Sequence, residues 1–123
     1  MPKEEPELDR ARLGRRSKRK GAHHEREVAE ILRKLYPNAK RGLGQARAGG
    51  EVPDVAGTPW WVEAKHRKVE NVRAALRQAE DARDASPGYK RHPPLVVSRK
   101  DHQRDIVVMY LDDFVALMDF ILN

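Results

Sequence analysis

The apolar residues of this chain fall in a few short segments, and a hydrophobic core has to be built from these segments alone. Charged residues make up 36% of the 123 residues, so the stretches between the apolar segments cannot be buried. Three segments repeat apolar side chains at helical spacing: 22–36, 69–85 and 112–122. Four short segments have the apolar and β-branched composition of strands: 53–57, 60–65, 94–98 and 105–111.

The order of these segments predicts the fold class. With a short strand in the Gly- and Arg-rich stretch 39–50, the order is α-β-β-β-α-β-β-α. The natural packing for this α/β order is a central mixed sheet of about five strands flanked by helices. The helix over 69–85 then forms a crossover between the strands before and after it. The chain length suits one small domain, which we expect over residues 21–123.

The first twenty residues are expected to lie outside this domain. Residues 1–9 are acidic and contain two prolines, whereas residues 10–20 carry seven Lys or Arg and no acidic residue. Neither stretch has apolar periodicity, which predicts a disordered arm. Two interpretations stay open for this arm: a solvated tail, or a basic segment that lies along DNA.

Composition limits the partners that this chain can have. The formal net charge of +6 favours a polyanionic partner such as DNA, because Lys and Arg that neutralise phosphates release counterions. The absence of cysteine excludes disulfides and cysteine–zinc sites. No apolar run is long enough for a transmembrane helix, and the first twenty residues contain no secretory signal. We therefore expect a soluble, cytoplasmic protein with no membrane partner.

The strongest local motif is Asp54, followed after eight residues by Glu63-Ala64-Lys65. Side chains alternate along a strand, so Glu63 and Lys65 share one face, and a hairpin would place Asp54 beside Glu63. Two adjacent carboxylates favour a hard cation such as Mg²⁺, for which Mn²⁺ can substitute, and the Ala64 carbonyl can add an oxygen ligand. Lys65 can orient a water or stabilise a charged phosphate. The alternative is an exposed ladder of opposite charges.

The run 19–27, RKGAHHERE, leads directly into the first predicted helix. Together with PDVAG at 53–57 and VEAK at 62–65, it resembles the archaeal-type Holliday junction resolvases, a branch of the PD-(D/E)XK nucleases. The resemblance covers about residues 19–66. It implies a restriction-endonuclease-like core, a homodimer and Mg²⁺-dependent cleavage of four-way DNA junctions in recombination and repair.

The resemblance also assigns roles to individual residues. It makes Glu25 the carboxylate of the first helix, acting as a metal ligand or on a metal-bound water. Asp54 and Glu63 become metal ligands, with the Ala64 carbonyl beside them, and Lys65 becomes the catalytic lysine. Glu27 competes for the role of Glu25. Because the two glutamates lie two positions apart on a helix, only one of them can face the site.

Basic and polar residues near these motifs are candidate DNA contacts, with ordinary solvated charge as the alternative: Lys20, Arg41, Gln45, Arg47, His66, Arg67 and Lys68. The loop GLGQARAGGEV departs from the family pattern because it contains no Ser or Thr. Gln45 and Arg47 are the residues that can replace that hydroxyl as phosphate contacts.

Three other features allow more than one interpretation each. Trp60 and Trp61 point to opposite faces of their strand, so we expect one in the core, and the other to pack, to stack on a base or to line a dimer seam. Gln78 is either a solvated helix residue or a residue that orients the site. The apolar face of the last helix, 112–122, is expected to pack on the core, with a dimer interface as the alternative.

Three functions remain open from the sequence. The first is a structure-selective endonuclease that resolves Holliday junctions. The second is a nuclease of the same type that acts on DNA ends, flaps or specific sites. The third is a non-catalytic, basic nucleic-acid-binding module. The joint presence of Glu25, Asp54, Glu63 and Lys65 argues against the third, because a degenerate descendant would be expected to have lost at least one of them.

Overall fold

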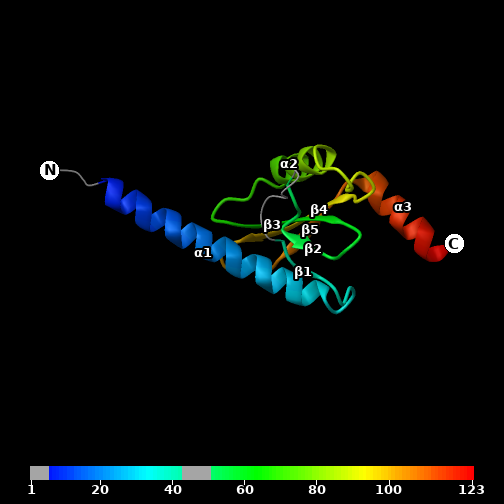
Figure 1. Ribbon diagram of the computed structural model, residues 1–123, viewed down its shortest axis with the longest axis horizontal. Coiled ribbons are helices and arrows are strands. Elements are labelled where there is room, and N and C mark those ends of the chain that lie inside the picture. Colours follow the sequence, from blue (N-terminus) through cyan, green and yellow to red (C-terminus); the bar gives the residue numbers. More distant parts are fainter. Residues whose placement is uncertain (1–5, 43–50) are drawn as a thin grey trace.

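A computed structural model describes residues 6–42 and 51–123, and its elements follow the order expected from the sequence (Figure 1). The helices are α1 (Pro6–Leu32), α2 (Val72–Asp84) and α3 (Leu111–Leu122). The strands of the described residues are β1 (Lys40–Arg41), β2 (Val55–Ala56), β3 (Trp61–Arg67), β4 (Pro94–Lys100) and β5 (Ile106–Val108). The order α-β-β-β-α-β-β-α is confirmed.

The described strands form one mixed sheet in the order β1-β2-β3-β4-β5. β3 and β4 are parallel over seven residue pairs, from Trp61↔Pro94 to Arg67↔Lys100, and α2 connects them. The other neighbouring strands are antiparallel. The mixed five-stranded α/β sheet expected from the sequence is therefore confirmed, with β3 and β4 at its centre.

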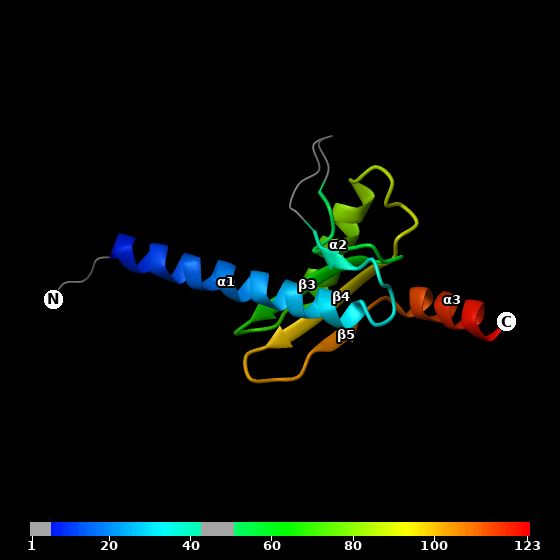
Figure 2. The ribbon, with the colours of Figure 1, turned by 60° about the horizontal axis from the view of Figure 1, so that its bottom comes forward.

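Helices α1 and α2 lie on opposite faces of this sheet (Figure 2). On one face, Val28 and Ala29 of α1 pack with Val62 and Ala64 of β3, in a cluster that includes Leu95 of β4. On the other face, apolar residues of α2 pack against the middle of the sheet: Leu76, Ala79, Ala82, Trp61 and Val96. Because both faces of β3 are covered over its first half, residues 61–64 are buried whichever way their side chains point, whereas the strand becomes exposed toward Arg67.

The two adjacent tryptophans of the β3 region illustrate this two-sided burial. Trp61 is fully buried in the cluster beneath α2, which confirms that one of the pair belongs to the core. Trp60 packs on the α1 side, is partly buried, and donates a hydrogen bond from Nε1 to the Tyr36 hydroxyl at 3.2 Å. Both tryptophans thus have structural contacts within the chain.

Helix α1 corrects one expectation. Residues 6–20 were expected to be disordered, but they continue the helix that carries Val28 and Ala29, and they project beyond the sheet (Figures 1 and 2). The physical reason is that Arg, Lys, Ala and Leu are strong helix formers. A helix already anchored at one end also extends without a new nucleation step. Residues 1–5 lie outside the described part of the chain.

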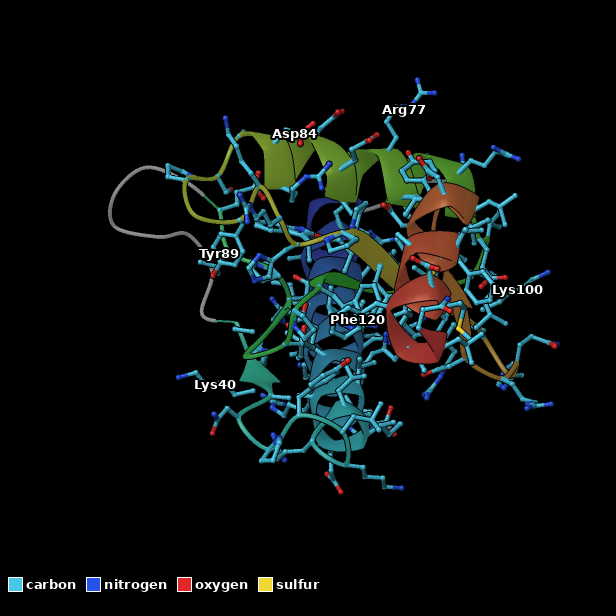
Figure 3. All side chains as sticks on the ribbon, turned by 90° about the vertical axis from the view of Figure 1, so that its right-hand side faces the viewer. Lys40, Arg77, Asp84, Tyr89, Lys100 and Phe120 are labelled. Carbon is cyan, nitrogen blue, oxygen red and sulfur yellow. The ribbon has the colours of Figure 1, made fainter. Side chains whose placement is uncertain are left out.

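Helix α3 corrects a second expectation. All its residues are described and none of them is buried, so it does not pack on the core. Phe120 is 84% exposed and Leu122 is 73% exposed. Figure 1 shows α3 leading away from the sheet, at the end opposite the free end of α1, and Figure 3 views the molecule from that end with Phe120 labelled. Among the described helices, none combines the length and apolar character needed to cross a membrane.

Candidate active site

A cavity of about 690 Å³ brings together the four residues that the motifs singled out. Glu25 comes from α1, Asp54 immediately precedes β2, and Glu63 and Lys65 come from β3. Residues of α2 close the other side of the cavity. The cavity therefore lies where α1, the β2–β3 hairpin and α2 meet.

The hairpin expected from the sequence positions Asp54. Gly57 in its turn has φ of +83°, and a Cβ atom there would lie 2.2 Å from the Asn38 carbonyl oxygen, so the turn requires glycine. β2 pairs with β3 at one position, Val55↔Val62. Beyond that pair, the Ala64 N–H donates to Asp54 Oδ2 at 3.0 Å, so the Asp54 side chain replaces the missing strand partner. The Ala64 carbonyl lies on the same strand edge as its N–H, because both groups of a residue point to one side of a strand.

Glu63 is held from two directions on the α2 side of β3. Its side chain is almost buried, and Oε1 accepts a hydrogen bond from Trp61 Nε1 at 3.1 Å. Lys65 Nζ lies 3.9 Å from Glu63 Oε2. Residues 61, 63 and 65 therefore share one face, as the alternation predicted. The contribution of Trp61 was missed, although the same alternation placed its side chain beside Glu63.

The environment of Asp54 favours its neutral form when no cation is present. Burial, followed by the negative charge of Glu63, raises the pKa of Asp54 to about 8, with a smaller contribution from Glu25, while the Ala64 N–H acts in the opposite direction. At neutral pH the carboxyl group is thus mainly protonated. A positive ion between the two carboxylates would reverse this preference, since an opposite charge favours the ionised form.

The donor set at this position suits Mg²⁺. Asp54, Glu63 and the Ala64 carbonyl are hard oxygen donors, and Mg²⁺ is commonly bound through one or two carboxylates with waters and substrate phosphates. Within the described residues, no group of three or more carboxylate or imidazole side chains is placed to hold a metal ion. The site thus fits an ion that takes its remaining ligands from water and substrate.

The side chains of Glu25 and Glu27 on α1 bind different partners. Glu25 lines the cavity and accepts a hydrogen bond from Arg41 Nε at 2.8 Å. Glu27 accepts from Arg99 at 3.0 Å and does not line the cavity. Glu25, the glutamate expected to face the site, therefore lines the cavity. Its carboxylate is bound by Arg41 and is not placed with Asp54 and Glu63 as a third metal ligand.

The expected DNA contacts separate into three groups. Lys20, His66, Arg67 and Lys68 line a second groove beside the cavity. Arg41 pairs with Glu25. Gln45 and Arg47 lie outside the described residues.

Helix α2 adds residues that the motifs did not assign. Arg77, Gln78 and Asp81 line the cavity. Gln78 had been left with two interpretations, and the structure places it at the cavity wall. Arg77 and Asp81 had no signal in the sequence because α2 carries no motif, and only the packing of the helix reveals which of its polar residues face the site.

Comparison of this chain with protein-family models, with characterised proteins and with solved structures gives no match. The functional interpretation therefore depends on the geometry of the cavity together with the motifs in the sequence.

Proposed function

We propose that this protein is a Mg²⁺-dependent endodeoxyribonuclease of the PD-(D/E)XK type that resolves four-way DNA junctions. One observation carries the proposal: Glu25 of α1, Asp54 before β2, and Glu63 and Lys65 of β3 line the same cavity. The raised pKa of Asp54 supports it, because strongly perturbed carboxyl groups in a cleft are typical of functional sites.

Each residue has a defined task in this proposal. Asp54, Glu63 and the Ala64 carbonyl would hold Mg²⁺, which when bound polarises the scissile phosphate and lowers the pKa of a coordinated water. Trp61 fixes one oxygen of Glu63, so that the other oxygen faces Lys65 and the cavity. Lys65 donates to the attacking water or to the phosphate oxygens as charge accumulates there. Glu25, held by Arg41, orients water at the opposite wall.

The proposal also specifies a DNA substrate, the four-way junction, and an oligomeric state, the two-fold dimer. The basic balance of the chain favours DNA, and the run RKGAHHERE carries the resemblance to junction resolvases. A two-fold dimer would present two such cavities to a junction with two symmetric cleavage positions. The exposed apolar side chains of α3 supply a surface for this contact, since patches of this kind mark interaction sites.

The test is to incubate the purified protein with a synthetic four-way junction and with the matching linear duplex, in Mg²⁺ and in EDTA. The Glu63→Gln variant removes one carboxylate charge from the site. The Glu30→Gln variant makes the same chemical change on the exposed surface of α1 and serves as its control. Paired symmetric nicks in the junction alone, lost with EDTA and with Glu63→Gln but kept with Glu30→Gln, are the expected result.

The other outcomes discriminate between the alternatives. Cleavage of duplex or ends at a similar rate would retain the nuclease and reject junction selectivity. Tight binding of DNA without cleavage of any substrate would reject the enzyme and favour a non-catalytic binding module.

A further inference from the structure

A groove of about 630 Å³ lies between α1 and the end of β3, next to the candidate active site. Its walls carry Arg16 and Arg19 from α1, and Arg67 and Lys68 from the end of β3 and the residue after it. Among the described side chains, no carboxylate lies within ion-pair distance of these four. They are therefore available to an anionic ligand.

The acidic residue in the groove wall, Asp101, already has partners. Its Oδ1 lies 2.6 Å from Lys20 Nζ and 3.1 Å from His66 Nε2. The Lys20–Asp101 pair thus leaves the groove strongly positive, and it connects α1 to the turn after β4. Lys20, which was expected to contact DNA, is held in this ion pair.

The groove and the candidate active site are continuous. His66 and Arg67 line both of them, and β3 runs from Glu63 in the cavity to Arg67 at the groove. Four residues of extended strand span about 13 Å, which corresponds to about four base pairs along a duplex. A duplex with one phosphate at the cavity would therefore carry its backbone past the groove.

The projecting half of α1 continues the same line of charge. Residues 10–20 contain seven Lys or Arg and no acidic residue, and they are helical and mostly exposed. Arg12 lies one helical turn before Arg16, on the same side as Arg16 and Arg19. Like charges at this spacing destabilise a free helix, so a bound polyanion would relieve that repulsion.

The composition of this segment selects between the possible polyanions. An anionic membrane surface is bound by helices with a broad apolar face of Trp, Phe or Leu. The described part of residues 10–20 offers Leu13 and Ala11 as its apolar side chains. A phosphodiester backbone needs no such face, and the adjoining cavity is built for phosphate chemistry under the proposed function.

We propose that this groove and the helical segment 10–20 bind the phosphate backbone of the same duplex, on one side of the bond that is cleaved. The inference rests on the proposed function for its substrate. From Glu63 along β3 and then along α1 to Arg12, the reach is about 25 Å, or about seven base pairs. Duplex of that length on one side of the cleaved bond is therefore a requirement for full affinity.

The experiment measures DNA binding by the full-length protein in EDTA, so that its outcome does not depend on cleavage. The test variant combines Arg12→Gln, Arg16→Gln and Arg19→Gln, with Gln chosen because it preserves helix propensity. The control variant combines Lys34→Gln, Lys90→Gln and Arg91→Gln, which removes the same charge from exposed positions outside the groove. Circular dichroism and thermal melting establish that both variants fold.

The expected result is a change in salt dependence. The slope of log K against log salt concentration falls by about 0.9 for each lost phosphate contact, hence by two to three for the test variant. The control variant keeps the slope of the wild type. Shortening one duplex arm below about seven base pairs weakens binding by the wild type but not by the test variant.

Three results would overturn the inference. The first is an unchanged slope in the test variant, and the second is equal sensitivity of both proteins to arm length. The third is a test variant that no longer binds phosphatidylserine vesicles, as the wild type does, but still binds DNA with wild-type affinity. If the salt slope changes as expected while no DNA is cleaved, the groove stands and the proposed enzyme fails, so the two proposals are separable.

Discussion

The two faces of the central sheet serve different ends, although the same strand supplies both. Toward α1, β3 presents Val62 and Ala64 to an apolar cluster. Toward α2, it presents Trp61, then Glu63 and Lys65, so that this face begins as core and ends as a polar cavity. A strand buried on both faces usually has a near-continuous apolar sequence. The difference indicates that the α1 face mainly stabilises the fold, whereas the α2 face carries polar side chains that lower stability and form the candidate site.

The largest effect on stability is expected from the α1 face. Leu95→Ala removes a buried side chain from the cluster that contains Val62, and it should lower the free energy of unfolding by about 2–5 kcal/mol. Chemical denaturation measures this change. Cleavage per folded molecule should remain at the wild-type level, and a loss of activity in the still-folded variant would show that the two faces are not independent.

The opposite sign is expected for Asp54→Asn on the other face. The pKa of Asp54 is raised to about 8 in the folded protein, so the folded state binds this proton more tightly than the unfolded state does. The resulting contribution to the free energy of unfolding is complete below about pH 4 and is lost as the pH rises through 8. Asn resembles the protonated acid and does not ionise. In EDTA at pH 9 the variant should therefore be more stable than the wild type by about 2 kcal/mol or more, and equal to it at pH 4.

Thermal melts across this pH range test the prediction, with Asp84→Asn at an exposed position of α2 as the control. A wild-type melting temperature that does not fall between pH 5 and pH 9, relative to Asp54→Asn, would contradict it. Cleavage should be lost in Asp54→Asn at every pH, since the variant cannot supply a carboxylate ligand.

Trp61→Phe tests the boundary between core and cavity on the α2 face. The ring still fills the apolar cluster, but Glu63 loses the hydrogen bond from Nε1. The Mg²⁺ concentration needed for half-maximal cleavage should rise about 10-fold to 100-fold, as for other groups that orient a metal ligand. Restoration of the wild-type rate at high Mg²⁺ is expected of a positioning residue, whereas a purely structural role would change the melting temperature and leave the Mg²⁺ dependence unaltered.

The smallest effect is expected from Glu27→Gln. Its pair with Arg99 is partly exposed and should contribute no more than about 1 kcal/mol. Cleavage should be unchanged, in contrast to Glu25→Gln, which alters a residue of the cavity. Measuring both variants side by side separates the two glutamates, and equal rates in the two would remove Glu25 from the proposed site.

What the sequence could predict depends on how local each interaction is. The β2–β3 hairpin and the shared face of Glu63 and Lys65 follow from alternation and turn residues over a dozen positions, and both predictions were correct. The helical state of residues 6–20 was missed because it depends on continuity with an anchored helix. The exposure of α3 and the approach of Arg77 to the cavity depend on how whole helices dock, which no short pattern encodes.

The sheet has a further consequence, for the folding of the chain. Its strands lie side by side in the same order as they occur in the sequence, so no strand has to be inserted between two that are already paired. Each new strand can add to the free edge left by the one before it, and the antiparallel pairs join positions that are 7 to 16 residues apart. Because folding rates fall as the sequence separation of contacts grows, we expect the parallel pairing of β3 with β4, whose partners lie 33 positions apart, to limit the folding rate of this domain.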